Sequence, residues 1–149
     1  MKHLIDIKTL EKPEIAQILS MARSFKFKKR KPSVQDATAC LMFMENSTRT
    51  KMSFDLAAQK LGMNVLHFNG GTSSLAKGET LADTLENLYA LGVNNLIVRT
   101  SDDKFFERAL NDIRVPLSFV NAGCGVTSHP TQALLDFLTM LEKLATVTF

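Results

Sequence analysis

The sequence predicts an α/β fold in which helices cover both faces of a parallel four-stranded sheet. Short apolar runs alternate with amphipathic helical patterns along the chain, and this alternation is typical of strand–helix–strand units. The apolar runs are nearly continuous, which indicates strands that are buried on both faces. The length of 149 residues is sufficient for one domain with a hydrophobic core.

Four apolar runs are the predicted strands of this sheet. They extend from Thr38 to Phe43, Asn64 to Phe68, Asn95 to Arg99 and Leu117 to Asn121. Each run has the length of an ordinary strand.

Helical patterns fill the segments before, between and after the strands. The predicted helices extend from Pro13 to Phe25, Thr48 to Leu61, Thr80 to Leu91 and Lys104 to Leu110, and a last helix begins at Pro130. Gly62 and Gly92 directly follow two of them, where glycine is favoured because it readily leaves the helical conformation. The last helix is expected to bury a stripe formed by Leu134, Leu135, Leu138 and Leu141.

Charge and hydropathy exclude several classes of partner. The net charge is +3, and most of the excess lies in the run from Lys26 to Lys31, which is interpreted as a solvated loop. Because no aromatic and basic recognition surface accompanies this run, a nucleic-acid partner is not expected. No apolar stretch is long enough to span a membrane, and the N-terminus lacks a signal-peptide core. We therefore expect a cytoplasmic protein without a membrane partner.

The two cysteines do not indicate a metal site or a cofactor. Cys40 lies in the first predicted strand and is interpreted as a core residue, whereas Cys124 is expected in a glycine-rich loop. Neither belongs to a Cys-x-x-Cys pair or has histidines at ligand spacing. His67 lies within a predicted strand and is expected to be a core or edge residue.

The segment from Ser47 to Thr50 is a candidate anion site. It follows the first predicted strand and opens a helix, so unpaired N–H groups and the positive end of the helix dipole would meet there. The Arg49 guanidinium and the hydroxyls of Ser47, Thr48 and Thr50 could donate to phosphate oxygens. The alternative is that Asn46 or Ser47 simply caps the helix while Arg49 lies in solvent.

A second polar segment, from His129 to Gln132, also follows a predicted strand and opens a helix. In a parallel sheet both turns lie at the carboxyl edge, where ligands bind in doubly wound folds. Arg99 ends the third predicted strand and would lie at the same edge. The alternatives are a helix cap for His129, a solvated first-turn residue for Gln132 and a surface charge for Arg99.

A glycine-rich loop from Gly70 to Thr80 contains Lys77 and precedes a helix. A nucleotide-binding P-loop requires Gly directly before the lysine and Ser or Thr directly after it. Ala76 and Gly78 occupy those positions, so nucleotide binding is disfavoured.

Three motifs in order resemble the aspartate/ornithine carbamoyltransferase family: Ser-Thr-Arg-Thr at 47–50, Lys-Gly-Glu-Thr at 77–80 and His-Pro-Thr-Gln at 129–132. The resemblance covers nearly the whole chain. Thr131 and the Lys-Gly-Glu loop favour the aspartate type over the ornithine type, which usually has cysteine at position 131.

The resemblance implies roles for the candidate residues. Ser47, Thr48, Arg49 and Thr50 would hold the phosphate of carbamoyl phosphate, Thr50, Arg99 and His129 would polarise its carbonyl, and Gln132 would hold the carbamoyl amide. Ser73 or Ser74, together with Lys77, would reach the active site of a neighbouring subunit. Arg49, Thr50, Arg99 and His129 are thus the expected catalytic residues.

The resemblance also implies an assembly and a reaction. Residues 1–149 correspond to a carbamoyl-phosphate-binding domain, and the aspartate-binding domain is expected to be absent from this chain. The expected assembly is a homotrimer with shared active sites, with room for regulatory or other biosynthetic subunits. The complete enzyme would form carbamoylaspartate for pyrimidine biosynthesis, and this chain alone would be inactive or nearly so. The alternatives are a stand-alone phosphometabolite-binding or inactive assembly module and the same domain of an ornithine-type enzyme.

Overall fold

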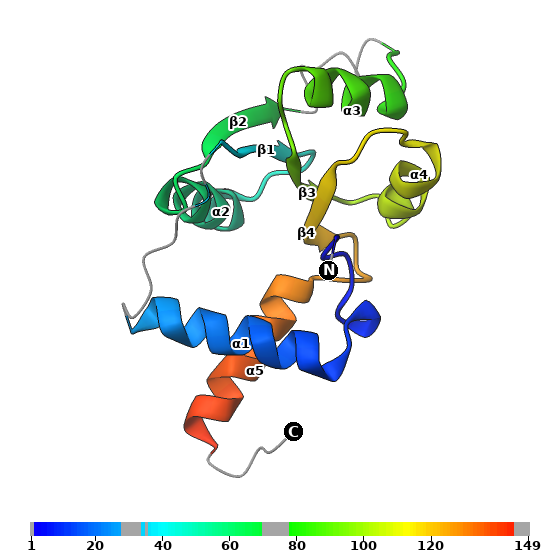
Figure 1. Ribbon diagram of the computed structural model, residues 1–149. Helices are drawn as coiled ribbons and strands as arrows, with labels where there is room; N and C mark the ends of the chain where they lie inside the picture. Colours follow the sequence, from blue (N-terminus) through cyan, green and yellow to red (C-terminus); the bar gives the residue numbers. More distant parts are fainter. Residues whose placement is uncertain (1, 28–33, 35, 70–77, 145–149) are drawn as a thin grey trace.

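The computed structural model describes residues 2–27, 34, 36–69 and 78–144, which form a parallel sheet flanked by helices (Figure 1). The strands are β1 (Thr38–Phe43), β2 (Asn64–Asn69), β3 (Asn95–Thr100) and β4 (Ser118–Cys124). They lie in the order β2-β1-β3-β4, and each neighbouring pair is parallel. The carboxyl ends of all four strands therefore lie at one edge of the sheet.

The helices connect and flank these strands. They are the short 3-10 helix η1 (Ile7–Thr9), α1 (Lys12–Lys26), α2 (Thr48–Lys60), α3 (Leu81–Ala90), α4 (Phe105–Asp112) and α5 (Pro130–Lys143). Gly62 and Gly92 follow α2 and α3 with φ angles of 79° and 92°. This left-handed backbone is accessible to glycine at little cost, and the expected helix ends are confirmed.

Both faces of the sheet are covered. Side chains alternate between the faces along each strand. On one face, Cys40 and Met42 of β1 belong to a buried cluster with residues of α3 and α4. On the other face, Leu41 and Phe43 of β1 pack with Ala58 of α2. The predicted α/β class, with helices on both faces of four parallel strands, is confirmed.

One strand departs from the expected burial on both faces. β2 lies at the edge of the sheet, and four of its six residues are exposed. His67 is one of them, and its Nε2 lies 3.1 Å from Asp55 Oδ2 on α2. His67 was expected in the core or at an edge of the sheet, and the structure places it at the edge.

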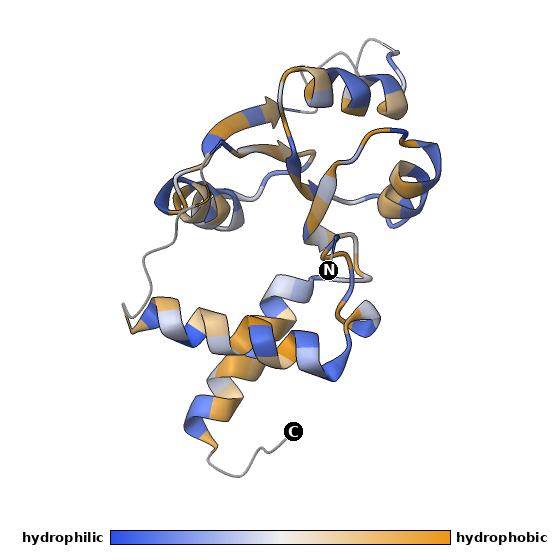
Figure 2. Ribbon diagram, viewed as in Figure 1, coloured by the Kyte–Doolittle hydropathy of each residue, from blue (hydrophilic) through white to orange (hydrophobic). Residues whose placement is uncertain are grey.

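A third apolar cluster joins α1 to α5, which cross below β4 in Figure 1. Leu19 of α1 and Leu134 and Leu138 of α5 are its buried members. Figure 2 shows the hydrophobic colour concentrated where the two helices meet. Leu135 was expected in the buried stripe but is 57% exposed. It lies about 100° around the helix from Leu134, outside the stripe that faces α1.

The last strand is longer than predicted. β4 continues to Cys124, three residues beyond the predicted end at Asn121. The expectation that Cys124 lies in a loop is therefore wrong. The pairing register between β3 and β4 shifts near its end, and this bulge allows Cys124 to pair again with Thr100. A bulge that contains glycine has no clear apolar pattern, so the sequence did not indicate it.

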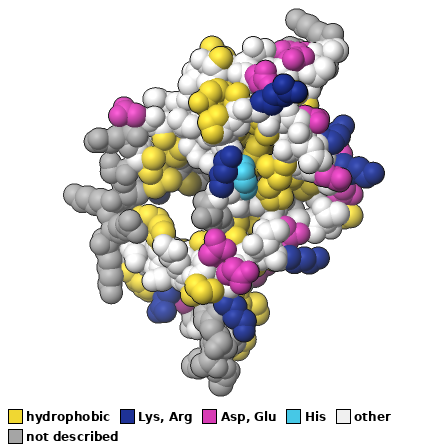
Figure 3. Space-filling model, turned by 45° about the vertical axis from the view of Figure 1, so that its right-hand side comes forward, with side chains coloured by type: hydrophobic (Ala, Val, Ile, Leu, Met, Phe, Trp, Pro, Cys, Tyr) yellow, Lys and Arg dark blue, Asp and Glu magenta, His cyan; other side chains and the backbone are white. Residues whose placement is uncertain are grey.

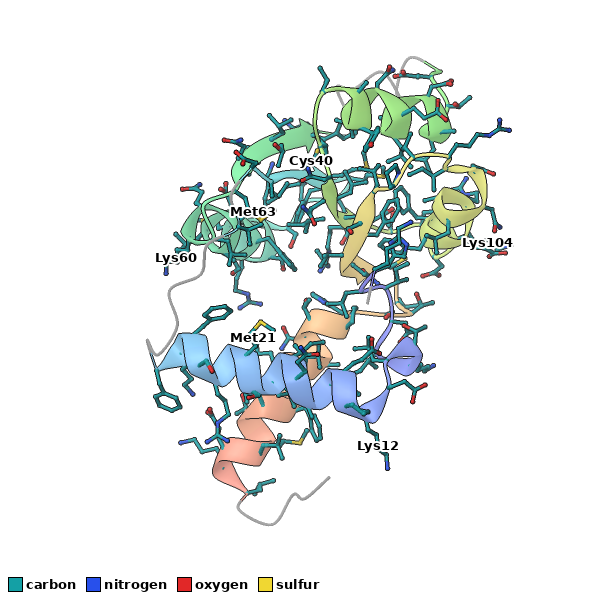
Figure 4. All side chains as sticks on the ribbon, viewed as in Figure 1. Lys12, Met21, Cys40, Lys60, Met63 and Lys104 are labelled. Carbon is teal, nitrogen blue, oxygen red and sulfur yellow. The ribbon has the colours of Figure 1, made fainter. Side chains whose placement is uncertain are left out.

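Figure 4 shows Cys40 between the layers, whereas Lys12, Lys60 and Lys104 lie on the outside of the molecule. On the face shown in Figure 3, acidic side chains are interspersed with basic ones. Within residues 2–27, 36–69 and 78–144, no helix has both the length and the apolar character needed to cross a bilayer.

Candidate active site

Two strand-to-helix turns meet at the carboxyl edge of the sheet. β1 leads through Ser47 into α2, and β4 leads through His129 into α5. Both residues occupy N-cap positions, yet neither side chain makes a capping hydrogen bond. The Ser47 hydroxyl therefore does not occupy the first N–H groups of α2, which are suited to bind an anion.

A pocket of about 440 Å³ lies between the two turns. Hydroxyl, guanidinium, imidazole and amide side chains line it: Ser47, Thr48, Arg49, Thr50, Arg99, His129 and Gln132. The structure thus brings together every predicted site residue that it describes. The predicted residues Ser73, Ser74 and Lys77 lie outside the described part of the chain.

A second cavity, of about 540 Å³, continues from this pocket between α2 and α5. Four residues line both cavities: Arg49, Thr50, His129 and Gln132. Phe54 and Ala57 of α2 and Leu135 of α5 make the second cavity more apolar. The polar pocket therefore adjoins a second cavity with a more apolar lining, and the exposed side chain of Leu135 lies in that cavity.

Arg99 is held in place by an acidic residue and by the backbone. Its Nε donates to Glu45 Oε1 at 2.5 Å, and its Nη1 donates to Ala122 O at 3.2 Å. Both charged side chains are partly buried, so their attraction is screened less than that of an exposed pair. Sequence reasoning did not single out Glu45. Its contact with Arg99 depends on the sheet pairing of Phe43 with Arg99, and the sequence carries no signal of that register.

His129 is biased toward the neutral form. Burial lowers its pKa, and the positive charge of Arg99 lowers it further. Its Nδ1 lies 3.3 Å from Thr131 Oγ1. A neutral imidazole has one donor nitrogen and one acceptor nitrogen, so it can accept from a hydroxyl and donate to a ligand.

Gln132 lies in the first turn of α5 and lines both cavities. Its Nε2 donates to Asp136 Oδ1 at 2.9 Å. Residues four apart lie on the same side of a helix, so this contact fixes the amide without removing it from the pocket.

The cysteines are not activated nucleophiles. Burial raises the pKa of Cys40 to about 11, and burial is also the main cause that raises the pKa of Cys124. Since the thiolate is the reactive form, neither thiol is suited to covalent catalysis. Among the described residues, no three His, Cys, Asp or Glu side chains form a group that could hold a metal ion.

Comparison with known proteins agrees with this geometry. Residues 2–142 match the family model for the carbamoyl-P binding domain of aspartate/ornithine carbamoyltransferase. The chain therefore belongs to the aspartate/ornithine carbamoyltransferase family, and the resemblance inferred from the three motifs is confirmed.

Solved structures of the aspartate type are similar to this chain. Aspartate transcarbamoylase from Trypanosoma cruzi in complex with carbamoyl phosphate is 32% identical with a TM-score of 0.86, and the match covers 97% of this chain and 48% of that chain. The catalytic subunit of M. jannaschii aspartate transcarbamoylase is 33% identical with a TM-score of 0.82, with the same coverage of 97% and 48%. This chain thus spans about half the length of these proteins.

Proposed function

We propose that the pocket between Ser47 and His129 binds carbamoyl phosphate and that, in the complete enzyme, the bound carbamoyl group is transferred to the amino group of aspartate. The observation that carries the proposal is a pocket that combines a helix N-terminus without a side-chain cap with Arg49, Arg99 and His129. The similar Trypanosoma cruzi enzyme in complex with carbamoyl phosphate supports the choice of ligand.

The phosphate would lie at the N-terminus of α2. There the N–H groups and hydroxyls of Ser47, Thr48 and Thr50 would donate to its oxygens, and Arg49 would add a charge-assisted contact. Carbamoyl phosphate is a mixed anhydride, so the attacking amine expels phosphate directly and needs no covalent intermediate on the enzyme. The contribution of the protein is to position the reactants and to stabilise the departing phosphate.

The carbonyl oxygen gains negative charge as the amine attacks, and it would face Thr50, Arg99 and His129. Since Nε and Nη1 of Arg99 donate to Glu45 and Ala122, Nη2 is the donor we assign to the ligand. If the Thr131 hydroxyl donates to Nδ1 of His129, the proton of the neutral ring is on Nε2, which can then donate to the carbonyl. His129 would act as an electrostatic donor, and the Gln132 side chain would hold the carbamoyl amide.

The complete site would include residues of a second subunit. We propose a homotrimer in which Lys77, with Ser73 or Ser74, enters the pocket of the neighbouring chain. A head-to-tail contact that closes into a ring would give equivalent shared sites. We also expect the 149-residue chain alone to transfer little or no carbamoyl group to aspartate, because the segment that orients the amine would lie in the remaining half of the enzyme.

The proposal is tested by calorimetric titration of the chain with carbamoyl phosphate and with inorganic phosphate. Arg49→Ala should weaken the binding of both ligands by about 10-fold to 100-fold, as expected for the loss of a charge-assisted contact. Arg114→Ala is the matched control, because Arg114 is exposed just before β4, at the opposite edge of the sheet. Equal affinities for the parent chain and Arg49→Ala would contradict the assignment of this turn.

A further inference from the structure

Asn121 is a buried polar residue of β4 to which the proposed reaction gives no role. Its side chain is 0% exposed, so the amide must satisfy its donors and its acceptor within the protein. Oδ1 accepts from Gly123 N at 2.8 Å, and Nδ2 donates to Ile5 O at 2.8 Å and to Ser128 O at 3.3 Å. One amide thus joins the N-terminal segment, the end of β4 and the segment that enters α5.

The hydrogen bond between Asn121 and Gly123 holds the backbone against which the Arg99 side chain lies. The register shift between β3 and β4 places Arg99 opposite two residues, Ala122 and Gly123. Within this bulge, Gly123 N donates to Asn121 Oδ1, and Ala122 O accepts from Arg99 Nη1. A Cβ atom added at Gly123 would lie 2.5 Å from Arg99 Nη1. The guanidinium therefore lies directly against the backbone that Asn121 holds.

The hydrogen bonds of Asn121 to Ser128 and Ile5 hold the backbone that leads into His129. Ser128 O accepts from Cys124 N at 3.0 Å in addition to Asn121 Nδ2. The Ser128 hydroxyl donates to Ile5 O at 3.3 Å, and the same carbonyl accepts from Asn121 Nδ2. Ser128 O belongs to the peptide bond that leads into His129, so these hydrogen bonds fix the point at which His129 enters α5.

We infer that Asn121 is a positioning residue of the pocket, whose buried amide holds the backbone under Arg99 and the backbone before His129 in a fixed relation. The inference rests on the proposed function, in which both side chains donate to one carbonyl oxygen and must keep their spacing. Arg99 and His129 line the same pocket, and each lies next to a backbone segment that Asn121 holds.

Two substitutions separate the contacts of the amide. Asn121→Ala removes all of them. It should weaken the binding of inorganic phosphate by about tenfold and raise the His129 pKa toward its ordinary value, as Arg99 moves away. Asn121→Asp keeps an acceptor for Gly123 N but places an oxygen opposite the carbonyls of Ile5 and Ser128. The NMR resonances of His129 should then shift, while the Arg99 Nε resonance stays at its parent position.

The matched control is Asn94→Ala. Asn94 Oδ1 accepts from Thr38 N at 2.9 Å at the opposite edge of the sheet. This control should lower thermal stability but leave phosphate affinity within about twofold and the His129 pKa unchanged. The inference would be overturned if Asn121→Ala lowered thermal stability but kept the phosphate affinity and the His129 pKa of the parent chain. The failure of both Asn121 variants to fold would also overturn it, because the residue would then be assigned to folding alone. If the parent chain binds no phosphate, the proposed function is contradicted. The effect of the Asn121 substitutions on the His129 pKa would still test the positioning role of Asn121.

Discussion

Arg99, which lines the same pocket, affects the pKa of His129. Both causes of its lowered pKa, burial and the charge of Arg99, disfavour the imidazolium form. Removal of the Arg99 charge is therefore expected to raise the pKa of His129. His3 provides an internal reference, because burial and Lys2, not Arg99, lower its pKa.

We expect Arg99→Gln to raise the His129 pKa and to leave the His3 pKa unchanged. The two values can be followed in one NMR titration of the imidazole carbon-bound protons between about pH 4 and pH 8. Arg114→Gln, at the opposite edge of the sheet, should move neither value. An unchanged His129 pKa in Arg99→Gln would show that the two side chains are farther apart in solution than in the structure.

The residues that the sequence identified at this site share a simple signal. Ser47, Arg49, Arg99 and His129 follow or end apolar runs, and in a parallel sheet these ends converge. Glu45 and Asn121 were not identified, because their roles depend on register and on the bulge in β4. A hydrogen bond between segments that are distant in sequence leaves no pattern in either segment.

At the scale of elements, α2 and α3 begin in different ways. Thr80 Oγ1 caps α3, since it accepts from Asp83 N at 3.1 Å and donates to Asp83 Oδ2 at 2.6 Å. Ser47 holds the corresponding position of α2 without a side-chain hydrogen bond. The start of α3 is stabilised by its cap, and the start of α2 is available to a ligand.

This difference predicts opposite effects for two similar substitutions. Thr80→Ala should lower the free energy of unfolding by about 1 kcal/mol and leave phosphate affinity unchanged, because a helix cap is lost. Ser47→Ala should change the free energy of unfolding by less than about 0.5 kcal/mol but weaken phosphate binding. Urea unfolding and calorimetry measure the two quantities. A loss of stability in Ser47→Ala equal to that in Thr80→Ala would favour the capping role for Ser47.

Most elements could be predicted because their local signals agree. β1 begins and ends where its apolar run does, and α5 begins at Pro130 as expected. The errors lie where tertiary structure decides. The burial of β2 depends on its place at the edge of the sheet, and the end of β4 depends on a bulge that only its partner strand defines.

At the scale of the whole molecule, this chain spans about half the length of the solved aspartate transcarbamoylases, 48% in each of the two compared above. The described residues that line the pocket lie near the end of β3 and at the starts of α2 and α5. Ligand binding can therefore be tested on this chain, whereas transfer and assembly are tested in a full-length version.

The proposed shared site predicts complementation between subunits. When full-length chains carrying Arg49→Ala are mixed with chains carrying Lys77→Ala, some sites in a hybrid ring combine an intact Arg49 with an intact Lys77 from the neighbour. Carbamoylaspartate formation should then exceed the sum of the two inactive parents. If subunits demonstrably exchange and activity does not return, Lys77 does not act in a neighbouring site.

The proposed function depends on the binding of carbamoyl phosphate in the pocket at the carboxyl edge of the sheet. The most direct measurement follows the backbone amide resonances of the 149-residue chain during titration with carbamoyl phosphate. We expect the largest shifts at Ser47, Thr48, Arg49 and Thr50, with smaller shifts at Arg99, His129 and Gln132. Residues around Leu19 and Leu138, which line a separate groove between α1 and α5, should stay at their positions. Shifts confined to that groove, or no saturable shifts at the Ser47 turn, would contradict the claim.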